Sequence, residues 1–166
     1  MSYDVEAFKA DIPPEILAIL DGATTPYSQP DQAEEALGAA LLRAPDSLGL
    51  RIAAYAFYFY KNRLWEAIPQ AEACLALAAA ALGLPQDWRM VRPDSARFSA
   101  LEQPQRVYLK SLVALGYCRA RLGDTQGGEA LLRKAASLDP KDQLGAASLA
   151  DLVARRGAGD EDDDES

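Results

Sequence analysis

The sequence predicts an all-α fold: a short helical-repeat solenoid of antiparallel helix pairs, with a C-terminal capping helix and a disordered acidic tail. Apolar residues make up 49% of the 166 positions and alanine is abundant among them, a composition that favours closely packed helices over strands. A pattern of small and large residues also recurs in the same register after about 34 residues, a period typical of helical repeats. These two observations decide the fold class.

The most regular repeat lies at 112–140 and reads LVALGYCRARLGDTQGGEALLRKAASLDP. Small residues, among them Gly116 and Gly128, alternate with large ones, so that two helices can pack antiparallel and present a face to the next pair. This unit predicts one helix pair.

A second unit stands upstream in the same register. The segment 31–47 repeats the second half of the pattern, and without a gap a further unit begins at Leu48. Asn62 and Gly123 then occupy equivalent positions, where a residue that tolerates a left-handed backbone is needed. The shared register therefore predicts a short array.

The second unit also departs from the pattern. Arg51 and Tyr55 stand where a large apolar residue and a small residue are usual, so we expect their helix to be rotated or splayed. Pro69 lies inside the next helix and should kink it. The segment 84–103 then interrupts the register, and a loop of this length in a small domain is often functional.

Taken in order, the expected helices share amphipathic or alanine-rich patterns between turn signals. They are 5–10, 14–20, 30–43, 47–60, 64–82, 104–122, 125–137 and 143–155. Asp46 and Asp142 are expected to supply N-cap oxygens for the helices that follow them. The last helix resembles the solvating cap that a repeat array needs at its end.

The chain accordingly divides into three segments: short N-terminal helices and a linker at 1–27, the helical domain with its inserted loop at 28–156, and the acidic tail at 157–166. The formal charge is −8, from 17 basic and 25 acidic residues, and Asp160 to Glu165 supplies six of the acids. We therefore expect no nucleic-acid partner. The sequence shows no signal-peptide pattern, and its most apolar run, 73–84, is too short to cross a bilayer, so a cytoplasmic protein is expected.

The residue types argue against catalysis. Histidine is absent, and so are a glycine-rich phosphate loop, a nucleophile elbow and an acidic cluster with metal-ligand spacing. Cys74 and Cys118 stand alone in helical patterns and are expected to be reduced core residues. We expect neither enzyme activity nor a cofactor or metal.

The repeat pattern of 31–155, with 84–103 as a gap, resembles the tetratricopeptide repeat (TPR) family. The resemblance implies a protein-binding groove lined by the first helix of each pair. Its expected lining is Ile52, Ala56, Phe59, Tyr60, Lys110, Val113, Tyr117 and Arg121. Members that grip a peptide's C-terminal carboxylate carry Lys and Asn in the groove. Ile52 and Val113 stand there in this chain, so chaperone C-terminal tails are not the expected ligand.

Aromatic residues mark further contact candidates. Tyr58 should be core, at least one of Phe59 and Tyr60 exposed for a partner, and Trp65 packed against the neighbouring unit. In the inserted loop, the possible contacts are Trp88, Arg89, Arg92 and Arg97. This basic loop would either dock on an acidic protein surface or fold back onto the groove.

A more specific resemblance rests on PDSLGLRIAAYAFYFYKNRLWEAI, the DWR of the insertion and RLGD…SLDPKDQLGA. These blocks look like the nitrogenase-associated factor of the T type, a short bacterial TPR-like accessory protein. The resemblance implies binding to the nitrogenase molybdenum–iron protein during assembly, protection or repair. The alternatives are a chaperone similar to the small acidic TPR chaperones of type III secretion, and a regulatory subunit of a partner enzyme.

Overall fold

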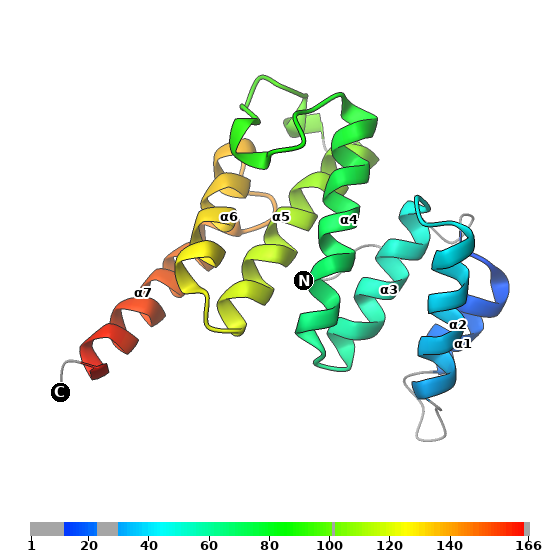
Figure 1. Cartoon of the computed structure of the whole chain (residues 1–166). Helices are drawn as coiled ribbons and strands as arrows, with labels where there is room; N and C mark the ends of the chain where they lie inside the picture. Colours follow the sequence, from blue (N-terminus) through cyan, green and yellow to red (C-terminus); the bar gives the residue numbers. More distant parts are fainter. Residues whose placement is uncertain (1–11, 23–29, 101, 165–166) are drawn as a thin grey trace. The chain divides into compact units, whose positions relative to one another are not determined.

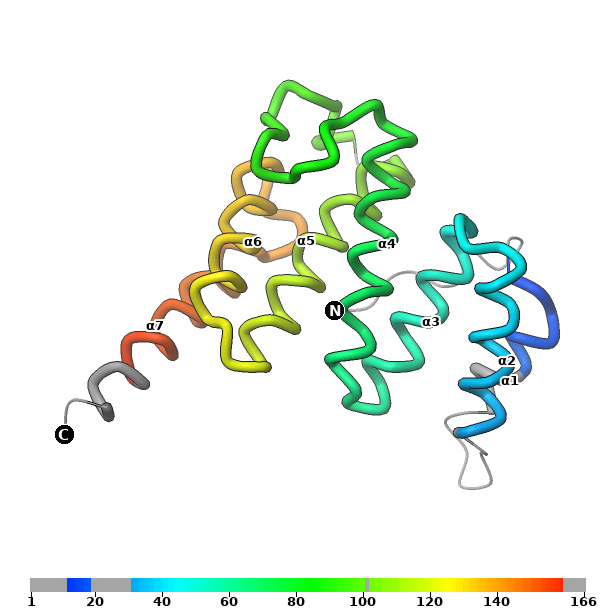
Figure 2. The backbone as a smooth tube through the Cα atoms, in the orientation of Figure 1, coloured from blue at the N-terminus to red at the C-terminus, as the bar shows by residue number. Residues whose placement is uncertain are grey.

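A computed structural model describes residues 12–22, 30–100 and 102–164 of the chain, and within them every regular element is a helix (Figures 1 and 2). The seven α-helices and two short 3-10 helices follow one another along the sequence. They are α1 (Pro14–Gly22), α2 (Pro30–Arg43), α3 (Leu48–Tyr60), α4 (Leu64–Leu82), η2 (Trp88–Met90), η3 (Phe98–Ala100), α5 (Gln103–Arg121), α6 (Thr125–Leu138) and α7 (Ala146–Asp164).

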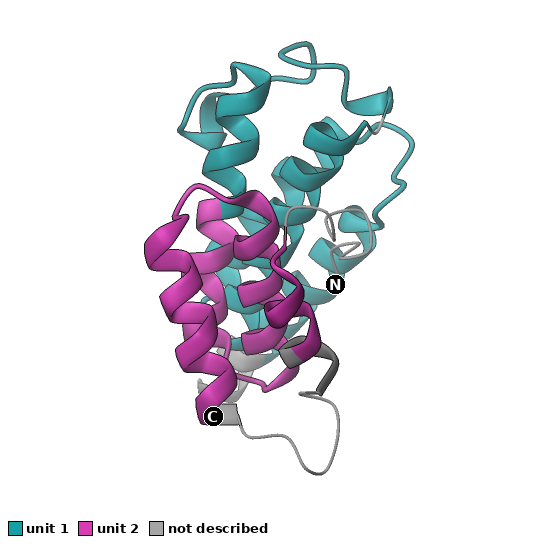
Figure 3. Ribbon diagram, turned by 90° about the vertical axis from the view of Figure 1, so that its right-hand side faces the viewer, with its two compact units in different colours: residues 1, 74–166 teal, residues 2–73 magenta. Residues whose placement is uncertain are grey.

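The all-α prediction is confirmed, and a repeat-like arrangement of neighbouring helices fits the structure. The expected helix at 5–10 and most of the following linker lie outside the described residues. The chain forms two compact units, Ser2–Ala73 and Cys74–Ser166, with Met1 grouped with the second (Figure 3). We call them the N-terminal and C-terminal units, and the boundary between them lies inside α4.

In the N-terminal unit, side chains close the ends of α3. Ser47 caps the helix by accepting a hydrogen bond from the Leu50 amide (3.3 Å), so the prediction that Asp46 is the cap is wrong by one residue. Asn62 takes the expected left-handed backbone, with φ of 57°, in the turn before α4. The α4 helix then continues through Pro69 as one element.

Arg51 and Tyr55, which depart from the repeat pattern, both have defined contacts. Arg51 donates hydrogen bonds to the Pro45 carbonyl (2.9 Å) and to Oε1 of Gln70 (3.1 Å), so it ties α3 to the preceding turn and to α4. Tyr55 is buried, and its ring stacks on that of Phe59 with 5.5 Å between centroids. The large side chain therefore fills core space where the pattern usually has a small one.

The C-terminal unit contains the regular helix pair, α5 and α6. A Cβ built on Gly128 would lie 2.6 Å from the Gly116 carbonyl oxygen, and one built on Gly116 would lie 2.9 Å from the Gly128 carbonyl oxygen. Two glycines therefore let the two backbones approach each other at the crossing. Asp124 caps α6 by accepting from the Gly127 amide (2.9 Å), directly after Gly123 with its positive φ of 103°.

α7 packs on α6 and is longer than the sequence predicts. The helix is drawn to Asp164, and the prediction of a disordered acidic tail at 157–166 stays a prediction. Asp142 was expected to cap a helix starting directly after it. The helix begins instead at Ala146, and Asp142 Oδ1 reaches the Ala147 amide at 3.5 Å.

Candidate partner-binding surfaces

The predicted groove residues on α3 differ in accessibility. Ile52 is fully buried and belongs to the core, whereas Ala56 and Phe59 are half-buried. Tyr60 is 71% exposed at the last position of the helix. In the N-terminal unit, Tyr60 is therefore the groove candidate that a partner reaches most easily.

The groove residues on α5 show the same division. Val113 is buried, Lys110 and Tyr117 are half-buried, and Arg121 is exposed. Arg121 donates a hydrogen bond to the Tyr117 hydroxyl (2.6 Å), and its guanidinium carbon lies 5.6 Å from the centre of that ring. Burial thus removes Ile52 and Val113 from direct contact with a partner, and the other groove residues stay predictions.

A cluster of charged side chains holds the turn between α3 and α4 in the N-terminal unit. Arg63 in this turn pairs with Glu34 of α2 (2.6 Å) and with Glu66 of α4 (3.0 Å). Its guanidinium carbon also lies 5.0 Å from the centre of the Tyr58 ring, and the Tyr58 hydroxyl donates to Glu34 (3.2 Å). Tyr58 is half-buried, in place of the fully packed core position that the sequence predicts.

The electrostatics of this cluster follow from its geometry. Hydrogen bonds from Arg63, opposed in part by burial, hold the pKa of the Glu34 carboxyl below its usual 4.5. Burial, followed by the negative charge of Glu34, raises the pKa of the Tyr58 hydroxyl above 10. Sequence reasoning missed this cluster because Glu34 and Arg63 are far apart along the chain and neither belongs to the repeat pattern.

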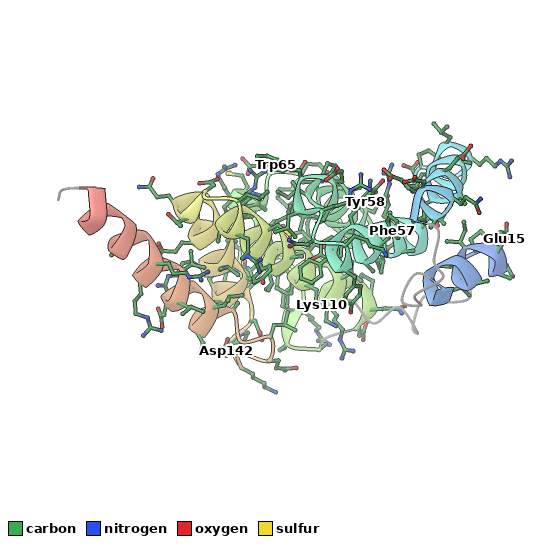
Figure 4. The ribbon with its side chains drawn as sticks, turned by 90° about the horizontal axis from the view of Figure 1, so that it is seen from below. Glu15, Phe57, Tyr58, Trp65, Lys110 and Asp142 are labelled. Atoms are coloured by element: carbon green, nitrogen blue, oxygen red, sulfur yellow. The ribbon has the colours of Figure 1, made fainter. Side chains whose placement is uncertain are left out.

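Trp65 is 71% exposed, so the prediction that it packs against a neighbouring unit is wrong (Figure 4). It lies in the first turn of α4, shortly after the exposed Tyr60 that ends α3. Pro69, one turn later, has no amide hydrogen, so the Trp65 carbonyl lacks the donor that the fourth following residue normally supplies. Exposed tryptophan is a residue type that often anchors protein interfaces.

The inserted loop in the C-terminal unit has a buried face and an exposed face. Leu84, Val91 and Phe98 are buried, and the Phe98 ring lies 6.0 Å from that of Tyr108 on α5. On the exposed face, the Arg89 guanidinium covers the half-buried Trp88 ring at 4.6 Å, and Met90 is 66% exposed. The other candidate loop contacts, Arg92 and Arg97, are exposed as well.

The described part of the chain contains no candidate metal site and no candidate membrane-spanning helix. Among the side chains that the structure describes, no group of three or more Cys, Asp or Glu residues is placed to hold a metal ion. Across residues 12–22, 30–100 and 102–164, none of the helices combines the length and the apolar character that a bilayer crossing requires.

Comparison with known proteins finds a relative that is similar to the chain in sequence and is itself uncharacterized. No family model matches it, and no solved structure does. It is 31% identical over 153 residues to the "uncharacterized 19.8 kDa protein in nifW 5'region" of Azotobacter chroococcum mcd 1, and the match covers 91% of this chain and 85% of that protein. The chain therefore belongs to the same family as the 19.8 kDa protein of the Azotobacter nifW 5' region.

Proposed function

We propose that this protein is a non-catalytic, protein-binding factor of nitrogen fixation that assists the assembly or protection of the nitrogenase molybdenum–iron protein. The observation that carries the proposal is the similarity to the nifW-region protein across nearly the whole chain. Because the name of that relative places it beside nifW, a nif gene, we infer that the present chain serves the same process.

The helical architecture supports a binding role on a TPR-like scaffold. The α5–α6 pair crosses at Gly116 and Gly128, two of the small residues that the repeat pattern aligns. Helical arrays of this kind use their surfaces mainly to hold other proteins. Exposed Tyr60 and Trp65 add aromatic side chains of the type that dominates binding energy in protein interfaces.

The direct test is affinity purification of the tagged full-length chain from its native host, grown with and without fixed nitrogen. We expect nitrogenase subunits to be recovered only under nitrogen-fixing conditions. Their absence under those conditions would refute the proposal. A secreted client would favour the secretion-chaperone alternative, and a stoichiometric enzyme whose turnover changes on binding would favour a regulatory subunit.

A paired variant examines the aromatic contacts. Tyr60→Ala with Trp65→Ala should lower the amount of nitrogenase recovered, because both rings are largely exposed and their loss removes contact area from the partner. Leu42→Ala is the matched control, since Leu42 is an exposed apolar residue of the same unit, on α2. Equal recovery by the two variants, with unchanged helicity, would exclude Tyr60 and Trp65 from the interface.

A further inference from the structure

We propose that the exposed face of the 84–100 loop, formed by Arg89, Met90, Arg92 and Arg97, docks on an acidic protein surface that presents an apolar side chain. This inference rests on the proposed role as a protein-binding factor and names the surface and the chemistry of its partner. We call this face the loop surface.

The charge of the chain is distributed unevenly. Residues 74–159 contain twelve basic and eight acidic residues, a net charge of +4, although the chain as a whole carries −8. The segment 1–73 has five basic and eleven acidic residues, and the six consecutive acids at 160–165 account for the remainder. The C-terminal unit without its acidic end is therefore a basic body within an acidic protein, which favours an acidic partner there.

The loop surface is held in place by packing and hydrogen bonds on its other side. The buried Leu84, Val91 and Phe98 anchor the loop to the C-terminal unit. The Lys134 ammonium of α6 donates to the Arg89 carbonyl (3.2 Å), and the loop passes over the end of α6 in Figure 1. A surface that is already ordered loses little conformational entropy when a partner binds.

Local hydrogen bonds define each turn of the loop. Asp87 accepts from the Arg89 amide (3.0 Å) and begins η2, and the Ser95 hydroxyl accepts from the Arg92 amide (3.0 Å). The arginine side chains are consequently displayed from a fixed backbone.

The arginines remain available to carboxylates of a partner. Within the described residues, Arg89 and Arg92 form long, exposed ion pairs, with Asp87 at 3.4 Å and with Asp94 at 3.6 Å, and such pairs contribute little and exchange readily. Arg97 is exposed and forms no ion pair within the part of the chain that the structure describes. Guanidinium groups bind carboxylates through two parallel hydrogen bonds, which suits them to an acidic surface.

Met90 supplies the apolar contact of the loop surface. The Met90 side chain is 66% exposed, whereas that of the following residue, Val91, is buried. Two residues before Met90 in the sequence, the Trp88 ring is covered by the Arg89 guanidinium. Methionine is flexible and adapts to the shape of an apolar partner. An apolar residue within a basic rim distinguishes a protein partner from a nucleic-acid backbone, which offers phosphates but no aliphatic side chain.

The test uses the full-length chain and a fluorescent synthetic peptide in which glutamates flank one leucine. Arg92→Glu combined with Arg97→Glu should weaken binding about tenfold at low salt, because two attractive contacts become repulsive. Arg155→Glu with Arg156→Glu is the control: it changes the net charge equally at two exposed positions of α7 and should leave the affinity within about twofold. Met90→Ser should weaken binding about fivefold, and only for the peptide that contains leucine.

Each outcome decides the proposal. Equal affinity of the two double variants would overturn it, and so would equal binding of a peptide with glutamine in place of glutamate. Tighter binding of single-stranded DNA, lost in the Arg92/Arg97 variant, would replace the protein partner by a nucleic acid. Unchanged circular dichroism of all variants shows that the fold persists.

The same variants separate this surface from the proposed function. If the wild-type chain recovers nitrogenase from fixing cells and the Arg92/Arg97 variant recovers as much, the loop surface is wrong while the function stands. If no nitrogenase is recovered but the acidic peptide still binds through the loop, the function is wrong while the loop surface stands.

Discussion

The close crossing of α5 and α6 makes a sharp prediction for Gly128→Ala. The added Cβ would lie 2.6 Å from the Gly116 carbonyl oxygen and 2.9 Å from both the Cβ and the amide nitrogen of Ala120. Two of these atoms belong to backbone, so they yield only if the helices separate. Overpacking of this kind costs about 1–3 kcal/mol, whereas replacing glycine by alanine inside a helix contributes about 1 kcal/mol of stability. The difference is a net loss of up to about 2 kcal/mol.

Gly38→Ala is the control for this prediction. Gly38 also lies inside a helix, α2, but a Cβ there would meet nothing within 4 Å. That variant should therefore gain up to about 1 kcal/mol from helix propensity alone. Urea titrations followed by circular dichroism give both values, and the thermal midpoint should move by about 2–4 °C for each kcal/mol. If Gly128→Ala stabilises the protein as Gly38→Ala does, the close backbone approach is refuted.

Four further predictions concern the polar groups and the C-terminal end. Arg63→Ala should lower stability by no more than about 1 kcal/mol, because its ion pairs are partly exposed and screened. Folding lowers the pKa of Glu34, so the ionised Glu34 carboxyl contributes to the free energy of unfolding above pH 4.5, and this contribution is lost as the pH falls further. Glu34→Gln should therefore flatten the acid limb of a stability-against-pH curve. Burial raises the pKa of Tyr108 to about 12, so stability should fall above pH 10, where only the unfolded state releases the proton. Tyr108→Phe should remove that fall and leave the stability at neutral pH unchanged, because the hydroxyl is buried and has no hydrogen-bond partner in the described residues. If the variant instead loses more than about 2 kcal/mol of stability at neutral pH, the Tyr108 hydroxyl does form a hydrogen bond. Deleting 157–166 should lower helicity but hardly change the unfolding midpoint, and a large loss would show that this end of α7 contributes to the core.

The helices could be predicted because their signals are local. The alternation around Gly116 and Gly128 identified the α5–α6 pair, and the position of Asn62 identified the turn before α4, since both depend on small residues at fixed spacing. The ends of the helices were predicted less accurately than the helices themselves. Ser47 caps α3, for example, although its neighbour Asp46 offers an equally good oxygen. The last helix likewise begins at Ala146 and not at residue 143 as the sequence predicts.

The candidate surfaces were harder to predict, because exposure depends on tertiary packing. Ile52 and Val113 occupy positions that line a groove in the resembling family, yet both are buried in this chain. Trp65 was expected inside and lies outside. Glu34 and Arg63 meet only because α2 lies against the turn that begins α4, and this contact has no periodic signal in the sequence.

The boundary between the two units falls between Ala73 and Cys74, in the middle of α4 rather than in a connecting loop. Separating the chain there would leave one fragment with unbonded carbonyls at its new C-terminus and the other with unbonded amides at its new N-terminus. Neither fragment would carry a complete set of helices. The two halves are therefore poor candidates for exchange as modules, and we expect gene truncations at this point to yield aggregation-prone products.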